Sequence, residues 1–378
     1  RGIIMGKKQV LALLLVFVLS MSILTACGKK DGVPEPEVSS TEPEAPQEVE
    51  PATRVIKDMA GREMEIPTKI EKVFTTSSVG TIALYSINPS LIAGLNSDVT
   101  ELEEKYLTKE YTSLPVLGRY KAGDSANEEE ILKAAPDIIL SMGDIDERWI
   151  SEADEAQEKL GIPFLMIDGD MENMDATYEF LGDILGEEER CKVLADYVKE
   201  TIEDTKKIAD TIAEDERVRV YYGSGEPLST NVAGSIHAQA IDLIGAINVA
   251  DVTVEKATGT VEVSIEEVLN WDPDLIIAVK DSKEDESSYE IIKTDPKWAN
   301  ISAVKEGHVY AIPNAPFNWF DRPPSINRLM GVRWLGNLVY PEYFDIDIKQ
   351  ETKDFYELFY HRTLTDDEVD EILENAIR

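Results

Sequence analysis

Two segments of this chain have nearly the same amino-acid sequence, and this repeat limits the folds that the chain can adopt. Residues 129–140 read EEILKAAPDIIL, and residues 266–277 read EEVLNWDPDLII. In each copy a polar residue, Asn127 or Ser264, precedes the glutamates as a helix N-cap would, a proline ends the helix, and a strand-like run follows. The repeat predicts one equivalent helix-to-strand unit in each half of the chain. Two unrelated connections are the alternative, because such units are common in α/β folds.

Short apolar runs on either side of the two copies predict two parallel sheets. Each run is nearly continuous in apolar residues and is followed by Gly, Ser or Asp, which is typical of strands buried on both faces. The predicted strands are 72–76, 91–95, 137–141 and 164–167 in the first half, and 217–222, 248–250, 274–279 and 308–312 in the second. The fold class predicted is therefore α/β, with two lobes that each have a central parallel sheet.

Between the lobes, residues 187–213 have apolar side chains at helical spacing and no Pro or Gly. At 1.5 Å per residue, one helix over this range would be about 40 Å long and would brace the lobes, whereas extended strands would allow wide hinge closure. We expect an N-terminal lobe at 54–170, a connecting helical segment at 171–213 and a C-terminal lobe at 214–378. The helices from about Lys349 onward are expected to pack on the C-terminal lobe.

Length and charge narrow the class of protein. The chain has 378 residues, a length that favours two hydrophobic cores. It carries 74 acidic and 37 basic residues, for a formal net charge of −37. That charge would repel nucleic acid and anionic lipid headgroups, so no nucleic-acid partner is expected.

The N-terminal segment predicts secretion and a lipid anchor. From Met5 the chain has two lysines, an apolar run at 10–24, and then Thr25-Ala26-Cys27, which resembles a bacterial lipobox. We interpret residues 1–27 as a lipoprotein signal peptide, with Cys27 acylated on the outer face of the cell membrane. An uncleaved transmembrane helix is the alternative, although the run is at the short limit for a span. Residues 28–53, acidic and without periodicity, predict a disordered tether.

Cysteine and histidine usage predicts neither a disulfide nor a resident cofactor. Apart from Cys27, Cys191 is the only thiol of the chain, and no spacing typical of a zinc site is present. Motifs of hydrolases, P-loop enzymes and dinucleotide-binding enzymes are also missing, so we expect a protein that is not an enzyme.

The residues from about Arg54 to about Tyr340 resemble the substrate-binding proteins of ABC importers for iron complexes, haem and cobalamin, the class III periplasmic binding proteins. Besides the lipobox and the repeat, the likeness rests on RVIKDMAGREMEIPTKIEKVF at 54–74, GSIHAQAIDLIGAINVAD at 234–251 and WANISAVKEGHVYAIP at 298–313. The resemblance implies two Rossmann-like lobes, one long rigid helix between them, a ligand cleft between the lobes, and a monomer that delivers its cargo to a permease dimer.

In that family one glutamate on each lobe docks onto permease arginines, and the matching residues here are Glu129 and Glu266. Carboxylates on separate lobes can form charge-assisted bonds with guanidinium groups of a two-subunit partner. The alternative is that each glutamate only favours the positive end of its helix dipole, which requires no partner.

We expect the loops that follow the predicted strands to form the ligand cleft. The candidate ligand contacts in these loops are Thr76, Ser77, Ser78, Arg119, Tyr120, Tyr222, His237, Asn318, Trp319 and Arg322.

Each candidate group also has a structural alternative. The hydroxyls at 76–78 can donate to a ligand or cap the helix that follows. Arg119 suits an anion but also a surface ion pair, and His237 can coordinate a metal, donate to an anion or have no ligand contact. The loop at 313–325, rich in proline and aromatic residues, suits a flat or anionic ligand by stacking and ion pairing, but aromatics also fill cores.

The predicted cargo is an iron complex (a ferric siderophore), haem or cobalamin. A small oxyanion such as molybdate is the second prediction, because it needs only a few donors and one or two positive groups. A surface adhesin with an α/β body stays open on composition alone.

Overall fold

The structure is a computed structural model that describes residues 52–120, 126–252, 259–280 and 287–378. The predicted signal peptide, Cys27 and nearly all of the predicted tether lie outside these residues. In the part of the chain that is described, no helix is both long and apolar enough to cross a membrane.

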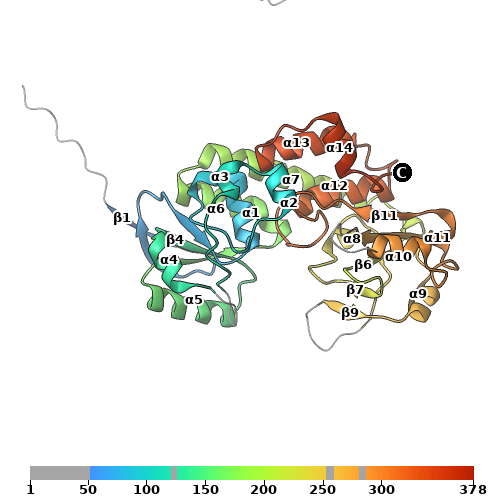
Figure 1. Cartoon of the computed structure of the whole chain (residues 1–378), viewed down its shortest axis with the longest axis horizontal. Coiled ribbons are helices and arrows are strands. Elements are labelled where there is room, and N and C mark those ends of the chain that lie inside the picture. Colours follow the sequence, from blue (N-terminus) through green and yellow to red (C-terminus); the bar gives the residue numbers. More distant parts are fainter. Residues whose placement is uncertain (1–51, 121–125, 253–258, 281–286) are drawn as a thin grey trace, which may run out of the picture. The chain divides into compact units, whose positions relative to one another are not determined.

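The N-terminal lobe has a parallel sheet in the order β3-β4-β5 and a separate antiparallel hairpin, β1-β2 (Figure 1). All three parallel strands are short and mostly buried, as their apolar sequences predict. The strands of this lobe are β1 (Thr53–Lys57), β2 (Glu63–Pro67), β3 (Val73–Thr75), β4 (Ile138–Gly143) and β5 (Phe164–Asp168). Its helices are α1 (Ser78–Ile87), α2 (Glu101–Tyr106), α3 (Lys109–Thr112), α4 (Glu128–Ala134) and α5 (Glu147–Leu160).

The strand predicted at 91–95 is wrong. Residues Pro89–Leu91 form the short 3-10 helix η1, which begins at Asn88, whose side chain accepts a hydrogen bond from the backbone of Ser90. Only single parallel bridges follow, from Ile92 to Val73 and from Leu95 to Val116. The apolar run is buried as predicted, but its backbone is committed to the turn and cannot form a continuous ladder.

The C-terminal lobe has a parallel sheet in the order β11-β10-β6-β8 and a small antiparallel pair, β7-β9. Its strands are β6 (Arg219–Gly223), β7 (Ser229–Asn231), β8 (Ile247–Asn248), β9 (Thr260–Glu262), β10 (Leu275–Val279) and β11 (Val309–Ile312). Its helices are α8 (Gln239–Leu243), α9 (Ile265–Trp271), α10 (Ser288–Thr294) and α11 (Ser302–Glu306). Two parallel sheets in one α/β chain confirm the predicted fold class.

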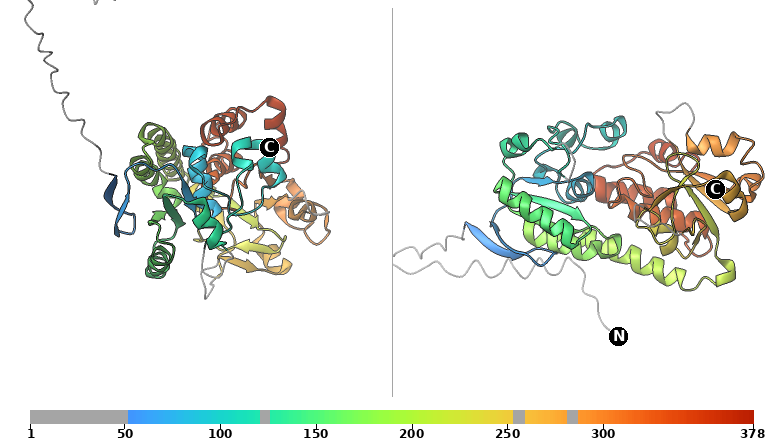
Figure 2. Two further views of the ribbon diagram at one scale, coloured as in Figure 1. Left: turned by 60° about the vertical axis from the view of Figure 1, so that its left-hand side comes forward. Right: turned by 90° about the horizontal axis from the view of Figure 1, so that it is seen from below.

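Two helices connect the lobes, where one was expected. The pair consists of α6 (Met174–Leu185) and α7 (Glu188–Ala209), which pack against each other; α7 also contacts α1 of the first lobe and α8 of the second (Figure 2). With 22 residues, α7 is about 33 Å long and ends before the predicted limit of 213. Its buried face consists of Cys191, Leu194, Ala195, Val198, Thr201, Ile202 and Thr205, which includes most of the predicted apolar stripe.

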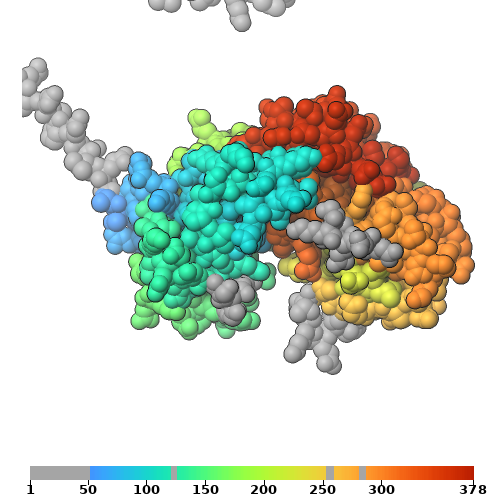
Figure 3. Space-filling model, in the orientation of Figure 1, coloured from blue at the N-terminus to red at the C-terminus, as the bar shows by residue number. Residues whose placement is uncertain are grey.

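The C-terminal helices do not pack on the C-terminal lobe alone, contrary to expectation. Helix α12 (Asn327–Val339) contacts α8, but α13 (Ile348–Tyr360) packs on α1 of the N-terminal lobe as well as on α12. The hydroxyl of Tyr85 in α1 donates to the carbonyl of Tyr360 at 3.2 Å. Lys105 in α2 pairs with Glu371 in α14 (Asp366–Ile372) at 2.6 Å, and the two regions lie side by side in Figure 3. The aromatic side chains of α13 explain this position, because they bury their apolar area among tyrosines of the N-terminal lobe.

The two copies of the repeated sequence form the same local structure. Asn127 and Ser264 are the N-caps of α4 and α9, and both side chains accept a hydrogen bond from the third backbone N–H of the helix. Each helix ends at a residue with positive φ, Ala135 or Asp272, directly before a proline. The strands β4 and β10 then follow. The predicted unit of N-cap, short helix, proline and strand is confirmed in both lobes.

Candidate functional site

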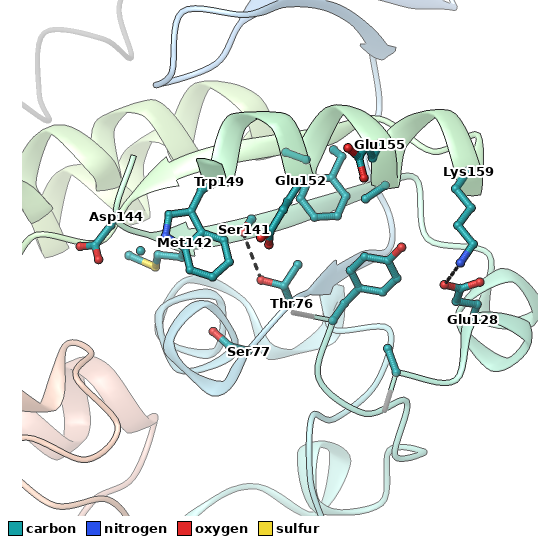
Figure 4. A pocket seen from close by; sticks show the side chains of 16 residues that line it. Thr76, Ser77, Glu128, Ser141, Met142, Asp144, Trp149, Glu152, Glu155 and Lys159 are labelled. Atoms are coloured by element: carbon teal, nitrogen blue, oxygen red, sulfur yellow. Dashed lines mark hydrogen bonds and ion pairs between the residues drawn. The ribbon is translucent and has the colours of Figure 1, made fainter. Parts of the chain in front are cut away.

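One cavity of about 340 Å³ lies in the N-terminal lobe, between α5 and the loops that follow β3 and β4 (Figure 4). Three predicted contacts, Thr76, Ser77 and Tyr120, line it together with Ser141 and Trp149. Thr76 is nearly buried; its hydroxyl donates to that of Ser141 at 3.4 Å, and its carbonyl accepts from the Tyr120 N–H at 2.9 Å. The sheet therefore brings together side chains that are separated along the chain.

The hydroxyl of Ser77 is not used to cap α1. Ser77 occupies the N-cap position with extended backbone, φ −155 and ψ 166, and makes no side-chain cap hydrogen bond. The first turn of α1 contains no acidic residue either. The helix-capping alternative for this hydroxyl is thus not what the structure shows, and the group is left for a ligand or for solvent.

The charge of the first cavity is negative. Four acidic residues, Glu128, Asp144, Glu152 and Glu155, and one lysine line it. That lysine, Lys159, is already paired with Glu128 at 2.5 Å (Figure 4). Burial raises the pKa of the Tyr120 hydroxyl, so this side chain is a neutral donor at physiological pH. The arrangement offers hydroxyls and aromatic surface and disfavours an anion.

A second cavity, of about 520 Å³, has walls from both ends of the chain. The N-terminal lobe contributes Ser78, Thr81 and Asn96, and the loop after β11 contributes Asn318 and Arg322. Lys105 and Arg322 are the two cations among the described residues that line this cavity. Lys105 pairs with the exposed carboxylate of Glu371, whereas Arg322 contacts the buried carboxylate of Asp321.

Part of the Arg322 guanidinium group makes contacts within the protein, and the rest is exposed to solvent. Its Nε lies 3.3 Å from Oδ2 of Asp321, and its Nη2 donates to the hydroxyl of Thr260 at 3.3 Å. The side chain is nevertheless 61% exposed. A guanidinium group has five N–H donors in a rigid fork, so donors are left for an anionic group.

His237 contacts the same carboxylate. Its Nδ1 lies 2.6 Å from Oδ1 of Asp321, and its side chain is 24% exposed. Over residues 52–120, 126–252, 259–280 and 287–378, no group of three or more His, Cys, Asp or Glu side chains is placed to hold a metal ion. The described residues thus place no three-ligand set around His237, whose metal contact stays a prediction.

Two predicted ligand contacts lie in the core. Trp319 is 0% exposed and Tyr222 is 1% exposed, and neither lines a cavity described above. The Tyr222 ring lies 4.4 Å from that of Phe320, and burial raises the pKa of its hydroxyl. These positions do not support direct contact with a ligand, because the aromatic rings complete the packing under the loop.

Two further candidates are Asn318, which contacts its own loop, and Arg119, which lies outside both cavities. Asn318 lines the second cavity, but its side-chain oxygen accepts from the N–H groups of Phe320 and Asp321 at 2.9 and 3.2 Å, so it shapes its own loop. Arg119 is exposed and lines neither cavity. Asp321 and Arg328 are site residues that were not predicted, although the Asp-Arg pair inside the aromatic loop was a usable signal.

The two candidate docking glutamates occupy equivalent positions. Glu129 and Glu266 are each the second residue of a helix, α4 or α9, and both are exposed. In the described parts of the chain neither carboxylate has a hydrogen bond or ion pair. Both are thus available to a partner, while each also sits where the helix dipole favours an acid.

Comparisons with known proteins agree with this geometry. The family model described as periplasmic binding protein matches residues 73–316. The chain is 25% identical to the molybdate-binding protein MolA of Haemophilus influenzae over 339 residues, which covers 84% of this chain and 93% of the relative. It is 24% identical over 341 residues to an uncharacterized ABC transporter substrate-binding lipoprotein of Bacillus subtilis, which covers 86% of this chain and 96% of the relative.

A solved structure extends the agreement to three dimensions. An ABC transporter solute binding protein from Sulfurospirillum deleyianum matches with a TM-score of 0.76 and 29% identity, covering 85% of this chain and 99% of that chain. The family match spans well over half of the sequence and includes both parallel sheets. The chain therefore belongs to the periplasmic binding protein family, the substrate-binding proteins of ABC transporters.

Proposed function

We propose that this protein is the extracytoplasmic substrate-binding component of an ABC importer and captures a ferric siderophore, haem or cobalamin. The observation that carries the proposal is Arg322, a largely exposed cation on a cavity walled by both lobes in a strongly acidic chain. Haem has carboxylates, cobalamin has a phosphodiester, and many ferric siderophores are anionic. Each can accept charge-assisted hydrogen bonds from a guanidinium group.

A small oxyanion is the second candidate cargo. The similarity to a molybdate-binding protein along most of both chains favours it. The second cavity offers hydroxyl and amide donors to an oxyanion, but Glu101, Glu103 and Glu371 also line it. The volume of that cavity, about 520 Å³, falls in the range of sites for larger organic ligands and favours the metal complex.

Delivery to the membrane rests on the two exposed glutamates and on the N-terminal cysteine. We propose that Glu129 and Glu266 contact arginines of a two-subunit permease, one per lobe, and that Cys27 carries the lipid that keeps the protein at the outer face of the membrane. The similarity to a lipoprotein supports the second point. The protein is expected to act as a monomer, without a resident cofactor and without catalysis.

A thermal-shift screen tests the cargo. The full chain is heated with a ferric siderophore, haemin, cobalamin or molybdate, since a ligand at about one hundred times its dissociation constant should stabilise the folded state by about 2.7 kcal/mol. We expect a shift with one of these, and a smaller one with Arg322→Ala. Arg217→Ala, at an exposed arginine that lines neither cavity, is the matched control. No shift with any probe would refute the proposed cargo.

A further inference from the structure

A buried carboxylate links two of the candidate cargo residues. Asp321 is 0% exposed, and each of its oxygens faces a different basic group: Oδ1 lies 2.6 Å from His237 Nδ1, and Oδ2 lies 3.3 Å from Arg322 Nε. His237 and Asp321 are 84 positions apart in the sequence. In the described residues Oδ2 makes no hydrogen bond of good geometry. Such a group is costly to bury and calls for an explanation.

The loop that carries Asp321 is held rigidly. The Asn318 side chain accepts from the Asp321 N–H, and the Trp319 N–H donates to the carbonyl of Pro313 at 3.0 Å. Helix α12 packs directly on this loop, since a Cβ at Gly331 would lie 2.0 Å from the Trp319 carbonyl oxygen. The position of the carboxylate is thus fixed by backbone contacts rather than by its ion pairs.

A third basic group lies behind the other two. Arg328 is 4% exposed, and its guanidinium donates to the carbonyl of Ile236 at 2.9 Å, which ties α12 to the residue before His237. Burial lowers the pKa of Arg328, and the nearby charge of Asp321 opposes that change. Its Nε is buried without a partner in the described residues. Arg328 is thus a further buried charge near Asp321, and Asp170 also opposes the fall in its pKa.

We propose that His237 and Arg322 form one subsite for an acidic oxygen group of the cargo, and that Asp321 is the residue that positions both. This inference rests on the proposed function. His237 contacts Asp321 through Nδ1, which leaves Nε2 for the cargo. Arg322 is oriented through Nε and presents its remaining donors beside the imidazole. The group recognised is a carboxylate, a phosphodiester or a small oxyanion, as found in haem, cobalamin and molybdate respectively.

Binding measurements on the full chain test the positioning role. We expect Asp321→Asn, His237→Gln and Arg322→Ala each to weaken binding of the probe selected by the thermal screen by about 10- to 100-fold, as for the loss of a hydrogen bond to a charged group. If Asp321 acts through the other two, Asp321→Asn should weaken binding little further in a His237→Gln, Arg322→Ala background. Asp272→Asn, at an exposed carboxylate that accepts from Ser302 in the same lobe, is the control and should bind as the parent does.

A spectroscopic measurement separates positioning from a general loss of structure. The chain has three histidines, so ¹⁵N imidazole NMR spectra resolve His237 from His308 and His361. We expect the probe to shift the nitrogen signals of His237 alone, and Asp321→Asn to remove the hydrogen-bonded Nδ1 proton signal in the absence of the probe.

The outcomes distinguish a failure of the proposed function from a failure of the subsite alone. A parent protein that binds none of the four probes overturns the proposed function, and this subsite with it. A parent that binds a probe while His237→Gln and Arg322→Ala bind equally well overturns the subsite alone. If Asp321→Asn fails to fold, the His237→Gln variant and the NMR titration of the parent still decide the question, because His237 is partly exposed.

Discussion

The two lobes share one structural unit but differ in the chemistry of their loops. Both have the N-capped helix, the positive-φ residue, the proline and the central strand of the repeat. The N-terminal lobe adds a cavity with hydroxyls and an excess of carboxylates, whereas the C-terminal lobe adds a loop with Asp321, Arg322 and Asn318. The lesson is that the repeat builds the scaffold, while the residues for cargo lie in loops outside it.

Glu129 and Glu266 occupy equivalent positions in the two lobes, and we expect them to have equal roles. Charge reversal at both positions, Glu129→Arg with Glu266→Arg, should abolish cargo uptake by cells and leave cargo affinity unchanged, because neither residue lines a cavity described here. Each single reversal should reduce uptake to a similar degree. Transport assays on whole cells and calorimetry on purified protein measure the two effects.

The matched controls for that experiment are two other first-turn glutamates, one per lobe. Glu147→Arg in α5 and Glu290→Arg in α10 change the same charge in the first turn of a helix outside the repeat. If they impair uptake as strongly as the repeat variants do, the docking role is refuted and only the helix-dipole role remains.

The rigidity of the C-terminal loop depends on a buried aromatic residue that has no counterpart in the N-terminal cavity. Trp319→Ala should lower the free energy of unfolding by about 3–5 kcal/mol, as expected for truncation of a fully buried tryptophan. Trp149→Ala, at a partly exposed residue of the first cavity, should cost much less. Urea denaturation compares them, and equal losses would contradict the special contribution of Trp319 to its loop.

Cargo affinity should depend more on the C-terminal lobe than on the N-terminal lobe. Ser77→Ala removes a neutral hydroxyl and should weaken binding only a few-fold, since a neutral hydrogen bond contributes about 0.5–1.5 kcal/mol. Arg322→Ala removes a charged donor and should weaken binding by about 10- to 100-fold. Isothermal titration calorimetry with the same probe measures both, and the reverse ranking would place the main cargo contact in the hydroxyl cavity.

The smallest predicted difference lies in the caps of the two copies. Ser264 and Glu267 form a full capping box in α9, whereas in α4 the corresponding Glu130 pairs with Lys133 at 3.3 Å. Ser264→Ala should cost about 1 kcal/mol of stability at neutral pH, and Asn127→Ala somewhat less.

The capping box also gives this difference a pH dependence. Hydrogen bonds from the Ser264 backbone and side chain lower the pKa of Glu267. The ionised Glu267 carboxylate therefore stabilises the fold fully at pH values above the ordinary glutamate pKa. This stabilisation is lost as the pH falls through the lowered pKa. Denaturation curves near pH 7 and pH 3 should show the effect of Ser264→Ala shrinking in acid, and no change would contradict a role for the Glu267 carboxylate.

Several structural features could be predicted from sequence because local patterns decide them. The caps at Asn127 and Ser264, most of the buried strands and the apolar face of α7 follow from hydrogen-bonding capacity and periodicity over a few residues. The strand at 91–95 could not, because an apolar run reports burial and not backbone pairing. The position of α13 also could not, since aromatic side chains can pack on either lobe.

The sequence by itself determined the family, the repeated unit, the acidic charge and the set of residue types available for cargo. Only the tertiary structure decided which of those residues meet. It buried Trp319 and Tyr222, put Thr76 and Ser77 beside an acidic cavity, and joined His237 to Arg322 through Asp321. The physical reason is that caps and strands depend on neighbours along the chain, whereas a binding site depends on loops brought together by sheets and helices whose contacts are long-range.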